Sequence, residues 1–156
     1  MKLGIYAVGH KMPEWLTAGF AEYSKRMPRE TRIELNEIKP EKRVSGKSTE
    51  QLLEAERGRI LADLPQQCIK IVLDERGEML TTLQLAERLK QWMQMGQDAA
   101  FVIGGADGLH EDIKRDTSLL WSLSRLTLPH ALVRVLLAEQ LYRAVTVIQG
   151  HPYHRE

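Results

Sequence analysis

The sequence predicts a single α/β domain, residues 1–156, built around a parallel sheet. Length is the first reason, because 156 residues suit one domain, whereas two domains would need about 100 residues each. Composition is the second, since 43% hydrophobic and 28% charged residues are close to globular averages. The third is a regular alternation of short apolar segments with longer amphipathic ones, which is typical of a parallel sheet covered by helices on both faces.

The first expected strand, Lys2–Val8, is a short apolar segment that ends at Gly9. A helix should follow, because Pro13 suits the first turn of a helix. The apolar residues expected on one face of this helix are Trp15, Leu16, Phe20 and Tyr23. Residues Arg32–Ile38 alternate apolar and polar side chains, which predicts a second, weaker strand.

A polar segment, Lys39–Lys47, contains a proline and a glycine and is expected to be a flexible loop. The next helix should begin at Ser48, because Ser48 and Gln51 have the spacing of a capping box. This helix should stop before Pro65. Its apolar positions are Leu52, Leu53, Ile60 and Leu61.

The third expected strand is Cys68–Leu73. A second capping-box spacing, Thr81 to Gln84, predicts a helix that ends near Gly96. Its apolar positions are Leu85, Leu89, Trp92 and Met93. Residues Ala99–Ile103 are predicted to form a buried strand that runs directly into a glycine-rich turn.

The last third of the chain is expected to contain a short acidic helix around Glu111–Asp116 and a last strand and loop, Leu119–Leu128. Pro129 should then begin the longest helix, which reaches about Gln149. A short tail, residues 150–156, follows it.

The longest helix is apolar at twelve positions between Leu132 and Ile148, more than the stripe that a surface helix needs. This excess predicts that a second subunit covers the helix, so that the protein is a homodimer with Leu137 at a dimer-facing position. The alternative is a central core helix within one domain. Glu139 and Arg143 lie four residues apart and should pair on the remaining polar strip.

Several classes of protein are excluded. No apolar run approaches the roughly 18 residues of a membrane span, and the first residues are typical of a strand rather than a signal peptide. The single cysteine, Cys68, cannot form an internal disulfide, so a reducing cytoplasm is the expected location. The net charge of +1 gives no evidence for or against a nucleic-acid partner. The segment Lys25–Lys47, however, carries eight basic and four acidic residues and could attract phosphates. A solvated loop and strand edge would explain the same segment.

The turn after the Ala99–Ile103 strand, Gly104–Gly108, lies where parallel sheets bind ligands. Its two adjacent glycines allow close approach of the backbone, although it matches neither a dinucleotide-binding motif nor a P-loop. Asp107 would repel a phosphate, so an adenosine ligand without phosphate fits better. A tight strand-to-helix turn without a ligand is the alternative.

A second candidate segment is Leu123–His130, in which polar and apolar residues alternate before Pro129. Free backbone groups beside leucine side chains suit an adenine ring, which is apolar on its faces and polar at its edge. An edge strand followed by a helix cap would give the same pattern.

The tail is the third candidate. His151 and His154 have a spacing that can bind metal, but no further ligands accompany them, so no metal is expected. Tyr153, His154 and Arg155 could stack on a base, exchange a proton and hold a phosphate. A frayed C-terminus is the alternative.

Taken together, these segments resemble the large-subunit ribosomal RNA methyltransferase H family of the SPOUT superfamily along the whole chain. The matching segments are KMPEW (11–15), GFAEY (19–23), IVLD (71–74), IGGADGL (103–109), SLSRLTLPH (122–130), LVRVLLAEQLYRA (132–144) and HPYHRE (151–156). The sequence departs from the family pattern at Ala106-Asp107 and at Arg125, which varies in size.

The resemblance implies a SPOUT-type α/β fold with a C-terminal trefoil knot, a homodimer, and S-adenosylmethionine as the cofactor. The cofactor-binding residues that it implies are Leu73, Gly105, Leu123, Ser124, Arg125, Leu126, Thr127 and Leu128. The activity that it implies is methylation at N3 of a pseudouridine, position 1915 in the family, in 23S rRNA of the assembled ribosome. Two alternatives stay open: a SPOUT methyltransferase acting on another RNA such as tRNA, and an RNA-binding module without catalysis.

In such a dimer we expect the tail of one subunit to reach toward the cofactor pocket of the other. His154 is the candidate base, since an imidazole is mostly neutral at neutral pH. Arg155 would hold a backbone phosphate and Tyr153 would stack on or position the base. Arg134 and Arg143 are second-rank candidates on the long helix.

Overall fold

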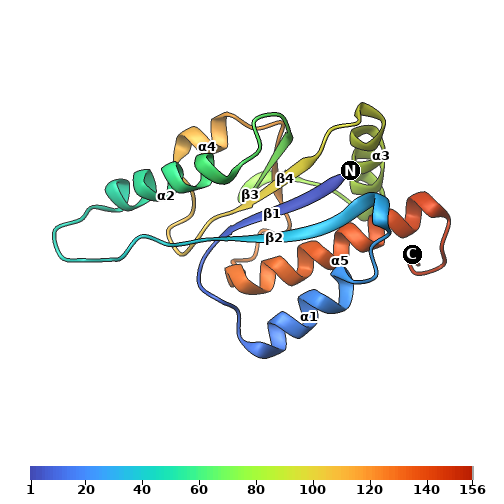
Figure 1. Cartoon of the computed structure of the whole chain (residues 1–156), viewed down its shortest axis with the longest axis horizontal. Helices are drawn as coiled ribbons and strands as arrows, with labels where there is room; N and C mark the ends of the chain where they lie inside the picture. Colours follow the sequence, from blue (N-terminus) through green and yellow to red (C-terminus); the bar gives the residue numbers. More distant parts are fainter. Residues whose placement is uncertain (156) are drawn as a thin grey trace.

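The fold is a five-stranded sheet in the order β2-β1-β4-β3-β5, seen in a computed structural model that describes residues 1–155 (Figure 1). All four neighbouring pairs are parallel, so the predicted parallel α/β fold is confirmed. The strands are β1 (Lys2–Val8), β2 (Arg32–Ile38), β3 (Ile69–Met79), β4 (Ala99–Ile103) and β5 (Leu119–Ser122). The helices are α1 (Glu14–Ser24), α2 (Thr49–Asp63), α3 (Thr82–Met95), α4 (Glu111–Arg115) and α5 (His130–Gln149), with a 3-10 turn at Arg29–Thr31.

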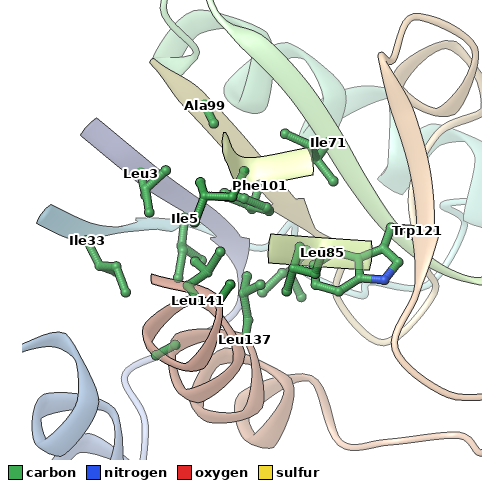
Figure 2. Close-up of a cluster of buried hydrophobic side chains, with 14 of the residues drawn as sticks. Leu3, Ile5, Ile33, Ile71, Leu85, Ala99, Phe101, Trp121, Leu137 and Leu141 are labelled. Atoms are coloured by element: carbon green, nitrogen blue, oxygen red, sulfur yellow. The ribbon is translucent and has the colours of Figure 1, made fainter. Parts of the chain in front are cut away.

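Side chains of the central strands alternate between two apolar layers, because successive residues of a strand point to opposite faces. On one face, Leu3 and Ile5 of β1 and Phe101 of β4 pack with α1, α3 and α5 (Figure 2). On the other face, Val8 of β1 and Val102 of β4 pack with α2 and α4. Helices therefore cover both faces, and the carboxyl edge of the sheet carries the loops.

The two predicted capping boxes are present. The hydroxyls of Ser48 and Thr81 each accept a hydrogen bond of 3.1 Å from the backbone N–H of Gln51 and Gln84, and both glutamine side chains accept in return. Gly96 ends α3 with φ of 69°, a left-handed conformation that glycine adopts without strain.

Three apolar residues that were expected on inward faces point outward. Trp15 of α1 is 68% exposed, whereas Leu16 and Phe20 are buried. Leu61 of α2 and Met93 of α3 are also exposed. In each helix the inward stripe follows the three- and four-residue spacing, so an apolar neighbour of a buried residue falls outside it.

Strand β3 continues beyond its expected end at Leu73, to Met79. Its register with β5 shifts between Leu73 and Glu78, and pairing with β5 resumes at Glu78 and Met79. A Cβ at Gly77 would lie 2.6 Å from the backbone of Leu120, so this close approach requires glycine. Because residues 74–78 are polar or glycine, the hydrophobic pattern did not predict that the strand continues.

Helix α5 lies against the sheet with α1 and α3 beside it (Figure 1). Leu137 is fully buried in this layer, so its expected position at a dimer interface is wrong. Much of the apolar surface of α5 is thus covered within the chain. This agrees with the alternative interpretation of α5 as a central core helix of one domain. Leu136, which is 37% exposed, is the large apolar residue of α5 that remains outward. No helix of the described residues is long and apolar enough to cross a membrane.

Candidate active site

A cavity of about 520 Å³ opens at the carboxyl edge of the sheet, within the size range of small-molecule sites. It is enclosed by the end of β3, the turn after β4 and the connection between β5 and α5. Its lining residues are 73–76, 103–109, 114, 123, 124, 126–130 and 133. The two segments singled out from the sequence therefore meet in one cavity.

Seven of the eight residues expected to bind a cofactor line this cavity: Leu73, Gly105, Leu123, Ser124, Leu126, Thr127 and Leu128. The eighth, Arg125, is not a lining residue. Its guanidinium donates to the carbonyl oxygen of Glu75, which ties the β5–α5 connection to the end of β3. Arg125 thus supports the cavity wall rather than forming it.

The glycine turn divides its roles between its two adjacent glycines. A Cβ at Gly104 would lie 2.7 Å from the backbone of Gly108, so the turn closes only with glycine there. A hydrogen bond of 3.0 Å from the Gly108 N–H to the Gly105 carbonyl closes the turn. A Cβ at Gly105 would meet Val8 at 3.2 Å, so a substitution there disturbs packing as well as any ligand.

The β5–α5 connection is shaped by hydrogen bonds to its own backbone. The Ser122 hydroxyl donates to the Ser124 carbonyl at 2.9 Å, and the Ser124 hydroxyl accepts from the Leu126 N–H at 2.9 Å. The Thr127 hydroxyl donates to the Glu75 carboxylate at 3.4 Å. These bonds fix the course of a segment whose Leu123, Leu126 and Leu128 line the cavity, which gives the apolar wall expected for an adenine site.

Carboxylates outnumber cationic side chains by three to two in the cavity wall, where Arg76 and Lys114 supply the positive charges. Asp74, Glu75 and Asp107 all line it. Burial would raise the pKa of Asp74, but the Arg76 N–H at 2.8 Å and the Lys114 ammonium at 3.1 Å outweigh burial and lower this pKa. Asp74 is therefore ionised at neutral pH, and the cavity suits a ligand with positive charge better than one with phosphates.

His130, the first residue of α5, forms part of the cavity wall. Burial lowers the pKa of its imidazole, and the nearby Arg134 and His10 lower it further. The ring is therefore neutral at neutral pH.

Arg134 is fully buried one turn along α5 from His130, and its Nη1 donates to Glu37 at 3.0 Å. A Cβ at Gly9 would lie 2.8 Å from its Nη2. This enclosed position rules out contact with a macromolecule, so Arg134 drops out as a second-rank catalytic candidate.

Aromatic residues hold the tail against the far part of α5. The Tyr153 hydroxyl donates to the Glu139 carboxylate at 3.2 Å, and the Arg143 guanidinium lies 4.7 Å from the Tyr153 ring centre. The rings of Tyr142 and Tyr153 have centres 4.8 Å apart. The expected Glu139–Arg143 pair is present at 2.6 Å, and Arg143 Nη1 lies 3.4 Å from His154 Nδ1.

Burial and the neighbouring Glu139 carboxylate raise the pKa of Tyr153 to about 12. Its phenol therefore stays protonated and acts as a hydrogen-bond donor, not as a base. Arg155 is exposed, and Glu156 lies outside the described residues. Among residues 1–155, no group of three His, Cys, Asp or Glu side chains could hold a metal ion.

Helix α5 begins at His130 in the cavity wall, and the C-terminus lies toward the other end of this helix (Figure 1). Tyr153 contacts Glu139, which is nine residues along α5 from His130, a separation of about 14 Å along the helix axis. The structure thus does not bring the tail residues of a chain to the cavity of the same chain.

Sequence reasoning missed the contribution of Glu75, Arg76 and Lys114 to the cavity. A signal for the first two exists, because β3 is parallel to β4 and residues after both strands must meet at one edge. No local pattern marks Lys114, which reaches the cavity from α4 through its ion pair with Asp74.

Comparisons with known proteins agree with this geometry. A family model described as "Predicted SPOUT methyltransferase" matches residues 1–154. Proteins named ribosomal RNA large subunit methyltransferase H are 61% identical over 155 residues in Nitrosospira multiformis and in Paraburkholderia phymatum, in each case covering 99% of both chains. The protein of that name from Methylobacillus flagellatus is 55% identical over 156 residues and covers 100% of both chains.

Solved structures show the same fold at low sequence identity. A probable methylase family protein from Haemophilus influenzae Rd KW20 has a TM-score of 0.53 at 15% identity, covering 99% of this chain and 70% of the other. A putative methylase family protein from Neisseria gonorrhoeae has a TM-score of 0.54 at 15% identity, covering 99% and 86%. With the family model and the full-length relatives, these matches show that the chain belongs to the ribosomal RNA large subunit methyltransferase H family of SPOUT methyltransferases.

Proposed function

We propose that this chain transfers a methyl group from S-adenosylmethionine to large-subunit ribosomal RNA. The proposed acceptor is N3 of a pseudouridine, position 1915 in the family, in the assembled ribosome. The observation that carries this proposal is the single cavity formed by the glycine turn and the β5–α5 connection, in a chain that matches its relatives along its whole length.

The cavity fits S-adenosylmethionine by its chemistry. This cofactor carries an adenosine, no phosphate, and positive charge on its sulfonium and amino groups. Leu73, Leu123, Leu126 and Leu128 would contact the adenine, and the main chain of this wall would bind its edge. The carboxylate of Glu75, which forms no ion pair among the described residues, would favour the positive charges, whereas Asp74 and Asp107 are already paired with Lys114 and Arg43. When bound, the cofactor supplies an electrophilic methyl group.

Methylation at N3 forms a nitrogen–carbon bond, breaks a sulfur–carbon bond and releases the imide proton of the base. Positioning the acceptor nitrogen in line with the breaking bond supplies much of the acceleration. The proton must pass to a base or to water. Neutral His130 lies in the cavity wall, but we do not propose it as this base. Its proposed role is to stay unprotonated, so that it adds no positive charge beside the cationic cofactor.

The protein is proposed to act as a homodimer in which the tail of one subunit completes the cavity of the other. The separation of tail and cavity along α5 supports this arrangement, because a chain cannot supply its own tail without dismantling the Tyr153 contacts. Tyr153 would position the nucleotide or the tail itself, His154 would accept the proton, and Arg155 would hold a phosphate. Because an arginine can only donate, His154 Nδ1 is the acceptor in its contact with Arg143. For Nδ1 to take up the proton of the substrate, this contact with Arg143 must break.

The trefoil knot implied by the family resemblance is part of the same proposal. So is a cytoplasmic location, because assembled ribosomes are the proposed substrate.

Transfer of a radiolabelled methyl group tests the proposed substrate. Whole ribosomes, free large subunits and bulk tRNA, all lacking the modification, would be supplied separately at equal concentration. We expect label in whole ribosomes, mapped to N3 of a pseudouridine by mass spectrometry of the digested RNA. Label in tRNA alone would assign the enzyme to another RNA, and label in none would leave only a binding module.

A further inference from the structure

The connection between β2 and α2, residues 39–47, is defined here as the arm. It extends away from the sheet at the end opposite to the C-terminus (Figure 1). Because β2 is parallel to its neighbours, the arm leaves the same carboxyl edge at which the cavity opens. Among the described residues, no arm side chain belongs to either hydrophobic cluster.

Polar contacts hold the arm against α2. Arg59 Nη1 donates to the Lys39 carbonyl at 2.9 Å, and Arg59 Nη2 lies 3.2 Å from the Glu41 carboxylate. The Glu41 N–H donates to Glu56 at 2.9 Å. The arm is a loop, as its composition predicted, and these contacts fix its first residues against α2 although it buries no core residue.

An ion pair joins the arm to the cavity. Arg43 Nη2 lies 2.6 Å from Asp107 Oδ2, and Asp107 lines the cavity. Asp107 is also the residue whose charge would repel a phosphate near the glycine turn. Arg43 offsets that charge and holds the arm beside the cavity mouth.

The other basic residues of the arm are available to a partner. Glu41, the acidic residue of the arm, is engaged by Lys47 at 3.5 Å as well as by Arg59. The side chains of Lys39 and Lys42 are exposed, and in the described part of the chain neither ammonium group forms an ion pair, although the Lys42 backbone N–H donates to Glu41 at 3.1 Å. With a net charge of only +1 for the whole chain, the positive potential here is local to the arm.

From this arrangement we propose that the arm binds the phosphate backbone of ribosomal RNA next to the cavity, with Lys39 and Lys42 contacting phosphates and Arg43 shielding them from Asp107. This inference rests on the proposed function. Lysine contacts to phosphates release counterions, so they strengthen binding in a salt-dependent way without reading sequence.

The double variant Lys39→Ala/Lys42→Ala tests the phosphate contacts. Binding to ribosomes would be measured by sedimentation over a series of salt concentrations, with methyl-transfer kinetics and calorimetry of S-adenosylmethionine alongside. We expect roughly tenfold weaker ribosome binding and a salt slope smaller by about two, at unchanged kcat and cofactor affinity. The matched control is Lys90→Ala, which removes an exposed lysine from α3. It should leave all four quantities unchanged.

A wild-type salt slope and a wild-type KM in the double variant would overturn the proposal for the arm. That failure is distinct from failure of the proposed function, in which the wild-type chain itself would methylate no RNA.

The shielding role of Arg43 is tested by a second pair of variants. Arg43→Ala should weaken ribosome binding more than Lys42→Ala, because it also exposes the Asp107 charge. Adding Asp107→Asn to Arg43→Ala should recover part of the loss. If Arg43→Ala/Asp107→Asn binds ribosomes no better than Arg43→Ala alone, Arg43 does not act through Asp107.

Discussion

Leu126 is the cavity-lining residue through which ligand charge can be tested most simply, because 72% of its surface is exposed and it belongs to neither hydrophobic cluster. Leu126→Arg places a positive charge at the cavity mouth. We expect about tenfold weaker binding of S-adenosylmethionine by calorimetry, equivalent to about 1.4 kcal/mol. Binding of S-adenosylhomocysteine, which lacks the sulfonium charge, should fall less.

Met95→Arg is the matched control for this substitution, since Met95 is 59% exposed at the end of α3. It should leave both affinities unchanged. Equal losses for the two ligands in Leu126→Arg would contradict a cavity that selects positive charge.

The pKa of His130 is expected to determine how cofactor affinity depends on pH. Its pKa is lowered from its ordinary value of 6.5, so the ring gains a proton only below that pH. Protonation adds a positive charge beside a cationic cofactor, and affinity should decline there while staying flat at higher pH. Calorimetry across this range should show the decline in the wild type and not in His130→Asn.

The same lowered pKa affects folding, because the unfolded chain takes up the proton first as the pH falls through 6.5. The neutral ring therefore favours the folded state above that pH, and this contribution is lost as the pH falls below it. A thermal melt at each pH separates lost binding from lost folding. An affinity that begins to fall above 6.5, or that falls equally in His130→Asn, would refute the role given to this residue.

At the scale of elements, α5 carries the prediction of a dimer. Leu136→Glu places a charge on the outward face of α5 and should convert a dimer at micromolar concentration into a monomer in sedimentation velocity. Leu61→Glu is a matched control, since Leu61 is 41% exposed on α2, across the sheet from α5. Its product should remain a dimer. A wild-type chain that sediments as a monomer would end the dimer proposal.

The sequence predicted the elements well where local chemistry decides them. Ser48 and Thr81 place two helix starts through capping boxes, short apolar segments identify β1 and β4, and the alternation of Ile33 and Leu35 identifies β2. It could not show that β3 runs on through polar residues 74–78, because pairing with β5 is a long-range contact. The inward direction of Leu137 likewise depends on where α1 and α3 pack.

The candidate site was predictable to the same degree. The glycine turn and Leu123–His130 each follow a strand that ends at the carboxyl edge, so their meeting could be expected from parallel topology. Their assignment to a cofactor came from the family resemblance. The pairing of Arg43 with Asp107, 64 residues apart, has no local signature and needed the folded structure.

At the scale of the whole molecule, the cavity and the tail of one chain are two incomplete halves of the proposed site. The cavity lies at one end of α5 and the tail at the other, where Glu139, Tyr142 and Arg143 hold Tyr153. A twofold-symmetric dimer would contain two equivalent sites. Each site would combine the cavity of one subunit with the tail of its partner.

Complementation between two defective chains tests whether each site is shared between two subunits. A chain truncated after Gly150 should bind S-adenosylmethionine and fail to methylate ribosomes. Leu126→Arg keeps its tail and should be nearly inactive at a cofactor concentration far below its Kd. Co-expressed, the two chains form heterodimers with one complete site, so the mixture should reach about one-quarter of the wild-type rate under random pairing. A mixture no more active than its separate parts, or a truncated chain as active as wild type, would contradict the account.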